Sequence, residues 1–217
     1  MKNKGYNLTK RRNKKVQRGK GQYLAQVNAV RKVLKLADLY RDQNQYPKYS
    51  NFKLGEFKSI KFFESYKKVL NERFYDYELK DNSLIQFISY TDSNHSFCYI
   101  SSPFSEEVEL NNRFTGSYPL KENFLIVRYD YQPSDYDKFC HPCAHFHFNI
   151  GNQIRLGIKK KLNPISFIFF ILRQCYPDKW SNYLERNNDK KIYRNIRNAL
   201  EDIPKEIFND EKELVLL

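Results

Sequence analysis

The sequence predicts an α+β domain in which helices pack on a mostly antiparallel sheet of about five strands. Two patterns support this fold class. Residues 124–131 and 141–150 alternate between apolar and polar side chains with a period of two, which is typical of half-buried strands. Other segments repeat apolar side chains every three or four residues, as amphipathic helices do. With 217 residues, 41% of them hydrophobic, the chain is long enough to bury a sizeable core.

The predicted elements follow one another with turn residues between them. We expect helices over residues 22–44, 56–74, 163–176 and 187–202, and strands over residues 82–89, 96–100, 124–131, 141–150 and 153–158. Residues 101–123 contain two prolines and a glycine, which indicates an irregular connection. Asn163 and Pro164 predict the start of one helix, with Asn as its N-cap, and Pro177 predicts its end.

Charge is concentrated at the N-terminus. The chain has a net charge of +13, and residues 1–20 contain nine Lys or Arg and no acid, so residues 21–217 carry only +4. We therefore expect a disordered basic arm over residues 1–20 and a single domain over residues 21–217. Such an arm favours binding to nucleic acid or to an acidic surface, and the alternative is a solvated terminus that only aids solubility. The arm cations assigned to nucleic acid are Lys10, Arg11, Arg12, Lys14, Lys15 and Arg18, with Arg194 and Arg197 of the last helix as a second basic stripe.

Several function classes are disfavoured by composition. The chain has seven Gly and neither of the usual glycine-rich nucleotide-binding motifs. Its longest apolar run, residues 165–172, is far shorter than the roughly 20 residues that cross a bilayer, so we expect no membrane association. The N-terminus lacks the apolar segment of a secretory signal, so the four cysteines are expected to be free thiols in a cytoplasmic protein.

Residues 141–150 gather most of the titratable side chains of interest. A strand of period two places His141, Cys143, His145 and His147 on one face, and Pro142, Ala144, Phe146 and Phe148 on the other. A polar face backed by an apolar one is how a sheet presents a functional site, so this stretch is the candidate site.

Six segments between Tyr77 and Trp180 carry a resemblance to a known family. The segments are LKDNSLIQF, YISSPF, VRYDY, HPCAHFHFNIG, the arginine of NQIRL, and NPISFIFFILRQCY. In their order and spacing they resemble a family of bacterial proteins catalogued as domain of unknown function 2290. The resemblance marks Arg128, Asp130, His141, Pro142, His145 and Arg155 as family positions, whereas Cys140, Cys143 and His147 look peculiar to this sequence. It supports the fold more than any chemistry.

The Cys and His residues invite comparison with zinc sites, which need four tetrahedral ligands. Four ligands from one extended strand cannot converge on one ion, so help would have to come from Asp130, His95 or Cys98. The spacing also matches no zinc-finger pattern. We therefore expect no bound metal and no cofactor.

Two further interpretations concern the same residues. In a metal-independent ribonuclease, His141 and His145 would exchange protons, Asp130 would orient a histidine, and Arg128 and Arg155 would hold the phosphate. In a structural interpretation, Asp130, Arg155 and the histidines instead form a hydrogen-bonded network that clamps two strands.

The sequence as a whole favours a nucleic-acid-binding protein, with RNA preferred because aromatic residues are plentiful and can stack on unpaired bases. We expect it to work with a protein partner inside a larger bacterial system, and a defence system is one such setting. The metal-independent ribonuclease is one alternative. A structural subunit whose basic arm contacts a partner protein's acidic surface is the other.

Overall fold

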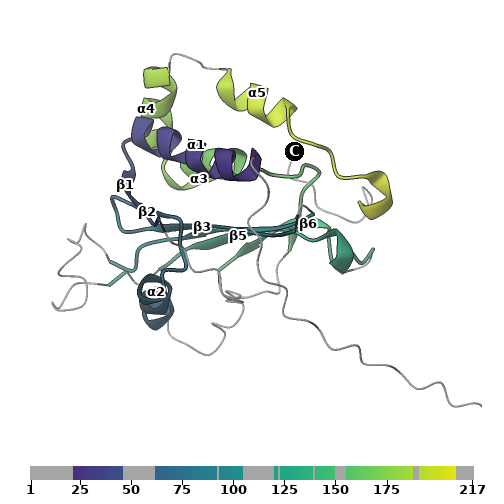
Figure 1. The fold of residues 1–217 in the computed structure, drawn as a ribbon, viewed down its shortest axis with the longest axis horizontal. Coiled ribbons are helices and arrows are strands. Elements are labelled where there is room, and N and C mark those ends of the chain that lie inside the picture. The colour runs from purple at the N-terminus through teal and green to yellow at the C-terminus, as the bar shows by residue number, and fades with distance from the viewer. Residues whose placement is uncertain are drawn as a thin grey trace, which may run out of the picture.

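A computed structural model describes most of the chain (Figure 1). The described residues are 22–45, 62–91, 93–104, 120–121, 123–138, 140–149, 155–187 and 191–208. The basic arm predicted for residues 1–20 and most of the connection predicted for residues 101–123 lie outside these ranges. The predicted α+β class is confirmed, because helices pack on a fully antiparallel sheet.

In the described part of the chain the sheet has seven strands, ordered as in the sequence. They are β1 (Tyr40–Gln43), β2 (Tyr77–Leu79), β3 (Leu84–Thr91), β4 (Asn94–Ile100), β5 (Ile126–Tyr131), β6 (Ala144–Phe148) and β7 (Leu156–Gly157). The prediction of about five strands is therefore two short. The missed strands are β1 and β2, whose four and three residues are too few to show an alternation.

The first helix, α1 (Gln22–Leu36), ends well before residue 44, where the sequence predicts its end. Asp38 adopts a left-handed φ of 57°, and the Leu39 amide donates to the Leu34 carbonyl at 2.9 Å. These two features form a Schellman-type helix end, after which the chain enters β1. An aspartate at the left-handed position gives a weaker stop signal than the usual glycine, so the apolar period alone predicts a longer helix.

The remaining helices differ from prediction mainly near the C-terminus. They are α2 (Phe62–Asn71), α3 (Pro164–Cys175), α4 (Pro177–Asn187) and α5 (Ile192–Asn198), with 3-10 turns η3 (Pro133–Asp135) and η4 (Lys205–Ile207). The N-cap of α3 is confirmed, because the Asn163 side chain accepts from the Ser166 amide at 2.9 Å. The helix α4 was not predicted: Pro177 ends α3 as expected, but it also occupies the first position of a new helix.

The two faces of the sheet are covered differently. Helices α1, α3, α4 and α5 lie on one side and α2 lies on the other (Figure 1). On the side of α1 and α3, a large core joins inward residues of every strand from β2 to β6 with Phe167, Ile168 and Phe169 of α3. On the side of α2, a smaller apolar cluster joins Tyr66 and Val69 to residues of β3, β4 and β5. Within the described residues, every helix is too short or too polar to cross a membrane.

Candidate functional site

The candidate site lies on the α2 side of the sheet, where β4, β5 and β6 run next to one another. Strand pairing aligns Ser96 with Asp130 and Asp130 with His145, so these three residues form one row across the sheet. Arg128 and His147 are paired in the neighbouring row. The intervening residues, such as Tyr129 and Phe146, belong to the large core on the opposite face. The alternation therefore places polar side chains together on one face, as the sequence predicts.

Asp130 is the centre of this cluster and is 5% exposed. Its Oδ1 accepts a hydrogen bond from the Ser96 hydroxyl at 2.7 Å, and its Oδ2 accepts one from Arg128 Nε at 2.8 Å. Burial alone would raise the pKa of Asp130. The hydrogen bond from His147, the charge of Arg128 and the Ser96 hydroxyl outweigh burial and lower that pKa to about 2. Asp130 is therefore a carboxylate at neutral pH.

His145 is held in one orientation by the backbone just before its strand. Its Nδ1 lies 2.8 Å from the Pro142 carbonyl oxygen. A carbonyl can only accept, so Nδ1 carries the proton, and the Nε2 of the neutral ring presents a lone pair. Burial lowers the pKa of His145 to about 4, so the ring is neutral at pH 7. It is 1% exposed.

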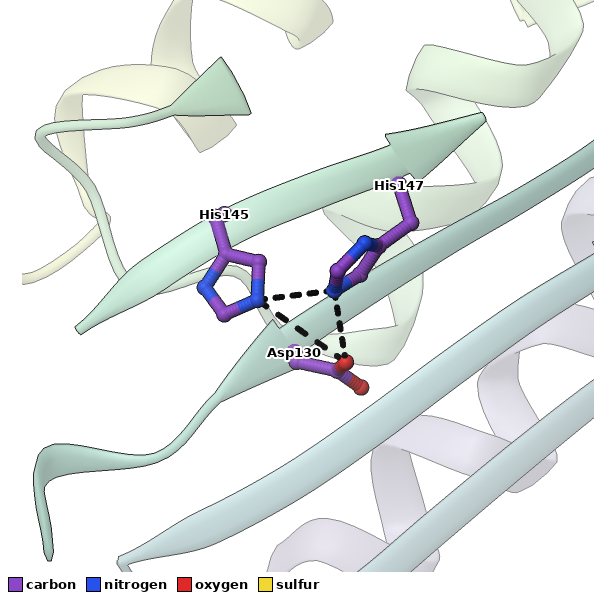
Figure 2. A group of neighbouring side chains, drawn as sticks. All are labelled: Asp130, His145 and His147. Carbon is purple, nitrogen blue, oxygen red and sulfur yellow. Dashed lines mark hydrogen bonds and ion pairs between the residues drawn. The ribbon is translucent and has the colours of Figure 1, made fainter. Parts of the chain in front are cut away.

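His147 completes a triangle of ligand-type atoms (Figure 2). Its Nε2 lies 2.9 Å from His145 Nε2 and 3.4 Å from Asp130 Oδ2, and His145 Nε2 lies 4.0 Å from the same oxygen. Figure 2 shows that the two imidazole rings on β6 and the carboxylate on β5 point toward one another. His147 is 3% exposed, and its Nδ1 is buried without a hydrogen-bond partner among the described residues.

Of the residues that the sequence assigns to this polar strand face, Cys143 lies elsewhere, and the prediction is wrong for it. His141 precedes β6 and forms an isolated bridge with Asp137. Cys143 sits at a bend before Ala144 and is buried in the large core, because the alternation begins only at Ala144. The histidines still come together, since the His141 and His145 rings are 4.9 Å apart. Burial, followed by the charge of Arg155, lowers the pKa of His141.

The two arginines predicted to hold a phosphate occupy different positions. Arg128 belongs to the buried cluster, and its Nε is bound to Asp130. Arg155 is exposed and acts electrostatically on His141. A polar network that joins neighbouring strands therefore exists around Asp130 and the histidines, with Arg128 and Ser96 in the place of Arg155. Ser96 was missed, since nothing in its local sequence distinguishes it from other strand serines.

The additional zinc ligands suggested by the sequence are divided between the two faces. Asp130 does meet the histidines, whereas His95 lies on the opposite face and stacks on Tyr131, with ring centroids 6.1 Å apart. Cys98 lies beside Arg128 in the sheet, and burial raises the pKa of its thiol far above the usual value. Cys140 is exposed at the turn before β6.

The predicted nucleic-acid-binding residues fall into two groups. Arg194 and Arg197 are exposed on α5, on the opposite side of the sheet from the Asp130 cluster. The cations of residues 1–20 lie outside the described residues. The structure therefore does not bring Arg194 and Arg197 together with the histidines.

Comparison with known proteins places the chain in a family. No curated protein and no solved structure matches it. A family model matches residues 38–217, a longer stretch than the resemblance between Tyr77 and Trp180. That match takes in most of the described sheet and helices, including the Asp130 cluster. The chain belongs to the family described as "Uncharacterized conserved protein (DUF2290)".

Proposed function

We propose that this protein binds nucleic acid, preferably single-stranded RNA, on the side of the sheet covered by α1, α3 and α5. The observation that carries the proposal is the charge of these three helices. Together they contain six Lys or Arg, all exposed, and no Asp or Glu: Arg31, Lys32, Lys35, Arg173, Arg194 and Arg197. The neighbouring helix α4 carries two cations and two acids, so the excess of positive charge on this side comes from α1, α3 and α5. Such an excess attracts a polyphosphate backbone, and counterion release strengthens the binding.

Aromatic rings accompany some of these cations, which favours unpaired bases over a duplex. Arg31 and Lys35 lie over the ring of Tyr40, at 5.3 and 5.2 Å from its centroid. Arg173 lies over the ring of Tyr193 at 5.3 Å. Proteins that bind single strands combine cations, which contact the phosphates, with aromatic rings, on which bases stack.

The N-terminal arm adds to the same charge. Residues 1–20 hold nine cations and no acid, and they directly precede α1 in the sequence. An arm of this composition would supply sequence-independent phosphate contacts while the helices supply a fixed surface. We also retain the proposal that the protein works with a protein partner in a larger system.

The test measures the affinity for a labelled single-stranded RNA by fluorescence anisotropy at several salt concentrations. The variant Arg194→Glu/Arg197→Glu should lower affinity about tenfold or more and reduce the salt slope by about two. Deleting residues 1–20 should weaken binding and flatten the slope further. The matched control is Lys68→Glu/Lys121→Glu, which makes the same charge change on the α2 side and should bind like wild type.

Two results would count against the proposal. One is wild-type protein that shows no salt-dependent binding. The other is equal loss in the α5 variant and in the control, which would indicate an effect of net charge alone. Competition with DNA of the same sequence tests the preference for RNA separately.

A second candidate function is the metal-independent ribonuclease. It is favoured by the proximity of the His141 and His145 rings, with Asp130 and Arg155 beside them. We rank it second because His145 is buried and its low pKa keeps it from carrying a proton at pH 7. RNA cleavage in the presence of EDTA, lost in His141→Ala and kept in His95→Ala, would reverse this ranking.

A further inference from the structure

We propose that Asp130, His145 and His147 bind one divalent transition metal ion, with zinc the best fit. The proposal concerns the α2 side of the sheet and does not depend on nucleic-acid binding by the helices. It revises the expectation of no metal, which rested on the inability of one strand to supply four ligands and on a spacing that matches no zinc-finger pattern. In the structure the third ligand comes from β5, the strand next to the one that carries both histidines.

The distances between the three ligand atoms fit a single ion. His145 Nε2, His147 Nε2 and Asp130 Oδ2 form a triangle with sides of 2.9, 3.4 and 4.0 Å. The circumradius of that triangle is about 2.0 Å, so an ion at its centre would lie within the usual zinc bond lengths of about 2.0–2.2 Å to nitrogen and oxygen. The spacing of the three atoms therefore matches what a single ion needs.

Neighbouring groups orient two of the three ligands, His145 and Asp130. The Pro142 carbonyl accepts from His145 Nδ1–H, which leaves the Nε2 lone pair directed at the site. A metal-bound histidine usually donates its other ring N–H to a carbonyl or carboxylate in this way. Ser96 and Arg128 hold the Asp130 carboxylate in place through one hydrogen bond to each oxygen. The two oxygens have about four acceptor sites, so a metal can share Oδ2 with Arg128.

Hydrogen bonds can join this triangle in more than one way. A proton on His147 Nε2 can point well at only one of His145 Nε2 and Asp130 Oδ2. Asp130 Oδ2 already accepts from Arg128 Nε, so when that proton points at Asp130, His145 Nε2 has no donor within the triangle. An ion would satisfy all three atoms at once. No described partner holds His147 Nδ1, so giving up the Nε2 proton would break no other hydrogen bond.

The chemistry of the donor set indicates the class of metal. Two imidazole nitrogens and one carboxylate oxygen suit zinc and related transition ions, whereas calcium and magnesium prefer oxygen alone. Because the resemblance does not mark His147 as a family position, the proposal is made for this chain.

The experiment uses full-length protein that has been stripped with EDTA and dialysed against zinc. Mass spectrometry of the metal content should give about one zinc per chain for wild type. The variants His147→Ala and Asp130→Asn should each lose it. The matched control is His95→Ala, which removes a histidine that is 8% exposed and lies on the other face of the sheet, and it should keep the zinc. Circular dichroism establishes that each variant is folded.

Cobalt provides a second measurement that needs no variant. Replacing zinc by Co²⁺ in wild type should give the visible absorption of a low-symmetry site with nitrogen and oxygen ligands and without a thiolate charge-transfer band. Absence of zinc from reconstituted wild type would overturn the proposal. So would zinc retained by folded His147→Ala, or a cobalt spectrum that shows cysteine ligands. RNA affinity measured in EDTA is unaffected by these outcomes, so the two proposals fail independently.

Discussion

The two faces of the sheet are built from alternate residues of the same strands, yet they are held together by different forces. On β5, Val127 and Tyr129 enter the large core, while Arg128 and Asp130 enter the polar cluster. On the first face, contact depends on shape and apolar area and has little direction. In the polar cluster on the second face, particular atoms meet particular partners, as Asp130 Oδ1 meets Ser96 and Oδ2 meets Arg128. Both faces are buried there, so burial alone does not distinguish packing from chemistry.

The apolar face is centred on aromatic rings. Phe97 of β4 is 1% exposed, and its ring centroid lies 5.4 Å from that of Phe87, 5.5 Å from Tyr129 and 5.8 Å from Phe167 of α3. The ring therefore joins three strands to the main covering helix. Such a residue stabilises through the area it buries and the cavity its removal would leave.

The largest expected effect is on this apolar face. Phe97→Ala should lower the free energy of unfolding by about 3–5 kcal/mol. In a chain of this length that corresponds to a decrease in melting temperature of roughly 6–20 °C, measured by circular dichroism. The control Leu120→Ala removes a hydrophobic side chain that is 49% exposed, and it should change the melting temperature little. Equal losses in the two variants would show that Phe97 is not the centre of the core.

The next effect tests the polar face. In metal-free protein, Asp130→Asn keeps the size of the side chain but removes the negative charge that Nε of the mostly buried Arg128 contacts. We expect a loss of about 2–3 kcal/mol, because a hydrogen bond to a charged group is removed and a charge is left in a poorly solvated position. Thermal unfolding in EDTA measures the loss.

Asp38→Asn is the matched control for this variant. Asp38 also contacts two cations, Lys80 and Lys179, but at the surface, where solvent screens the interaction. It should therefore change the melting temperature far less than Asp130→Asn. If both replacements have the same small effect, the Asp130 cluster contributes specificity or ligand binding but not stability.

The sequence was most informative where one face of an element is apolar over several residues. The alternation in β5 and β6 predicted both strands and placed His145, His147 and Asp130 among the candidate residues. The short strands β1 and β2 have too few residues for a period, and Pro177 carries the same signal whether it ends one helix or begins the next. These errors are local and leave the fold class intact.

The geometry of the site depends on which strands pair and in which register, and the sequence pattern does not reveal either. Arg128, and not Arg155, binds Asp130, because Arg128 and Asp130 lie two positions apart on β5 and therefore share one face of the sheet. The contribution of Ser96 follows from the register that aligns it with Asp130 across β4 and β5. Residue types indicated the chemistry that could occur, and the register determined which residues meet.

The smallest expected effect shows that directed contacts also matter on the apolar face. The helix α3 that covers this face begins with a capping box, in which Asn163 accepts from the Ser166 amide and Ser166 accepts from the Asn163 amide, each at 2.9 Å. The Ser166 amide lies in the first turn of α3, where no carbonyl of the helix can accept from it. Asn163→Ala removes its side-chain acceptor. We expect a loss of about 1 kcal/mol, which is roughly 2–4 °C in melting temperature.

Two further variants separate the cap from a general effect of replacing asparagine near a helix. Asn163→Asp keeps an oxygen acceptor at the N-terminus and should melt close to wild type, since a negative charge is favourable there. Asn195→Ala makes the same replacement at an exposed position inside α5, where alanine has the higher helix propensity, so it should be neutral or slightly stabilising. If Asn163→Ala melts like Asn195→Ala, then packing alone fixes the start of α3.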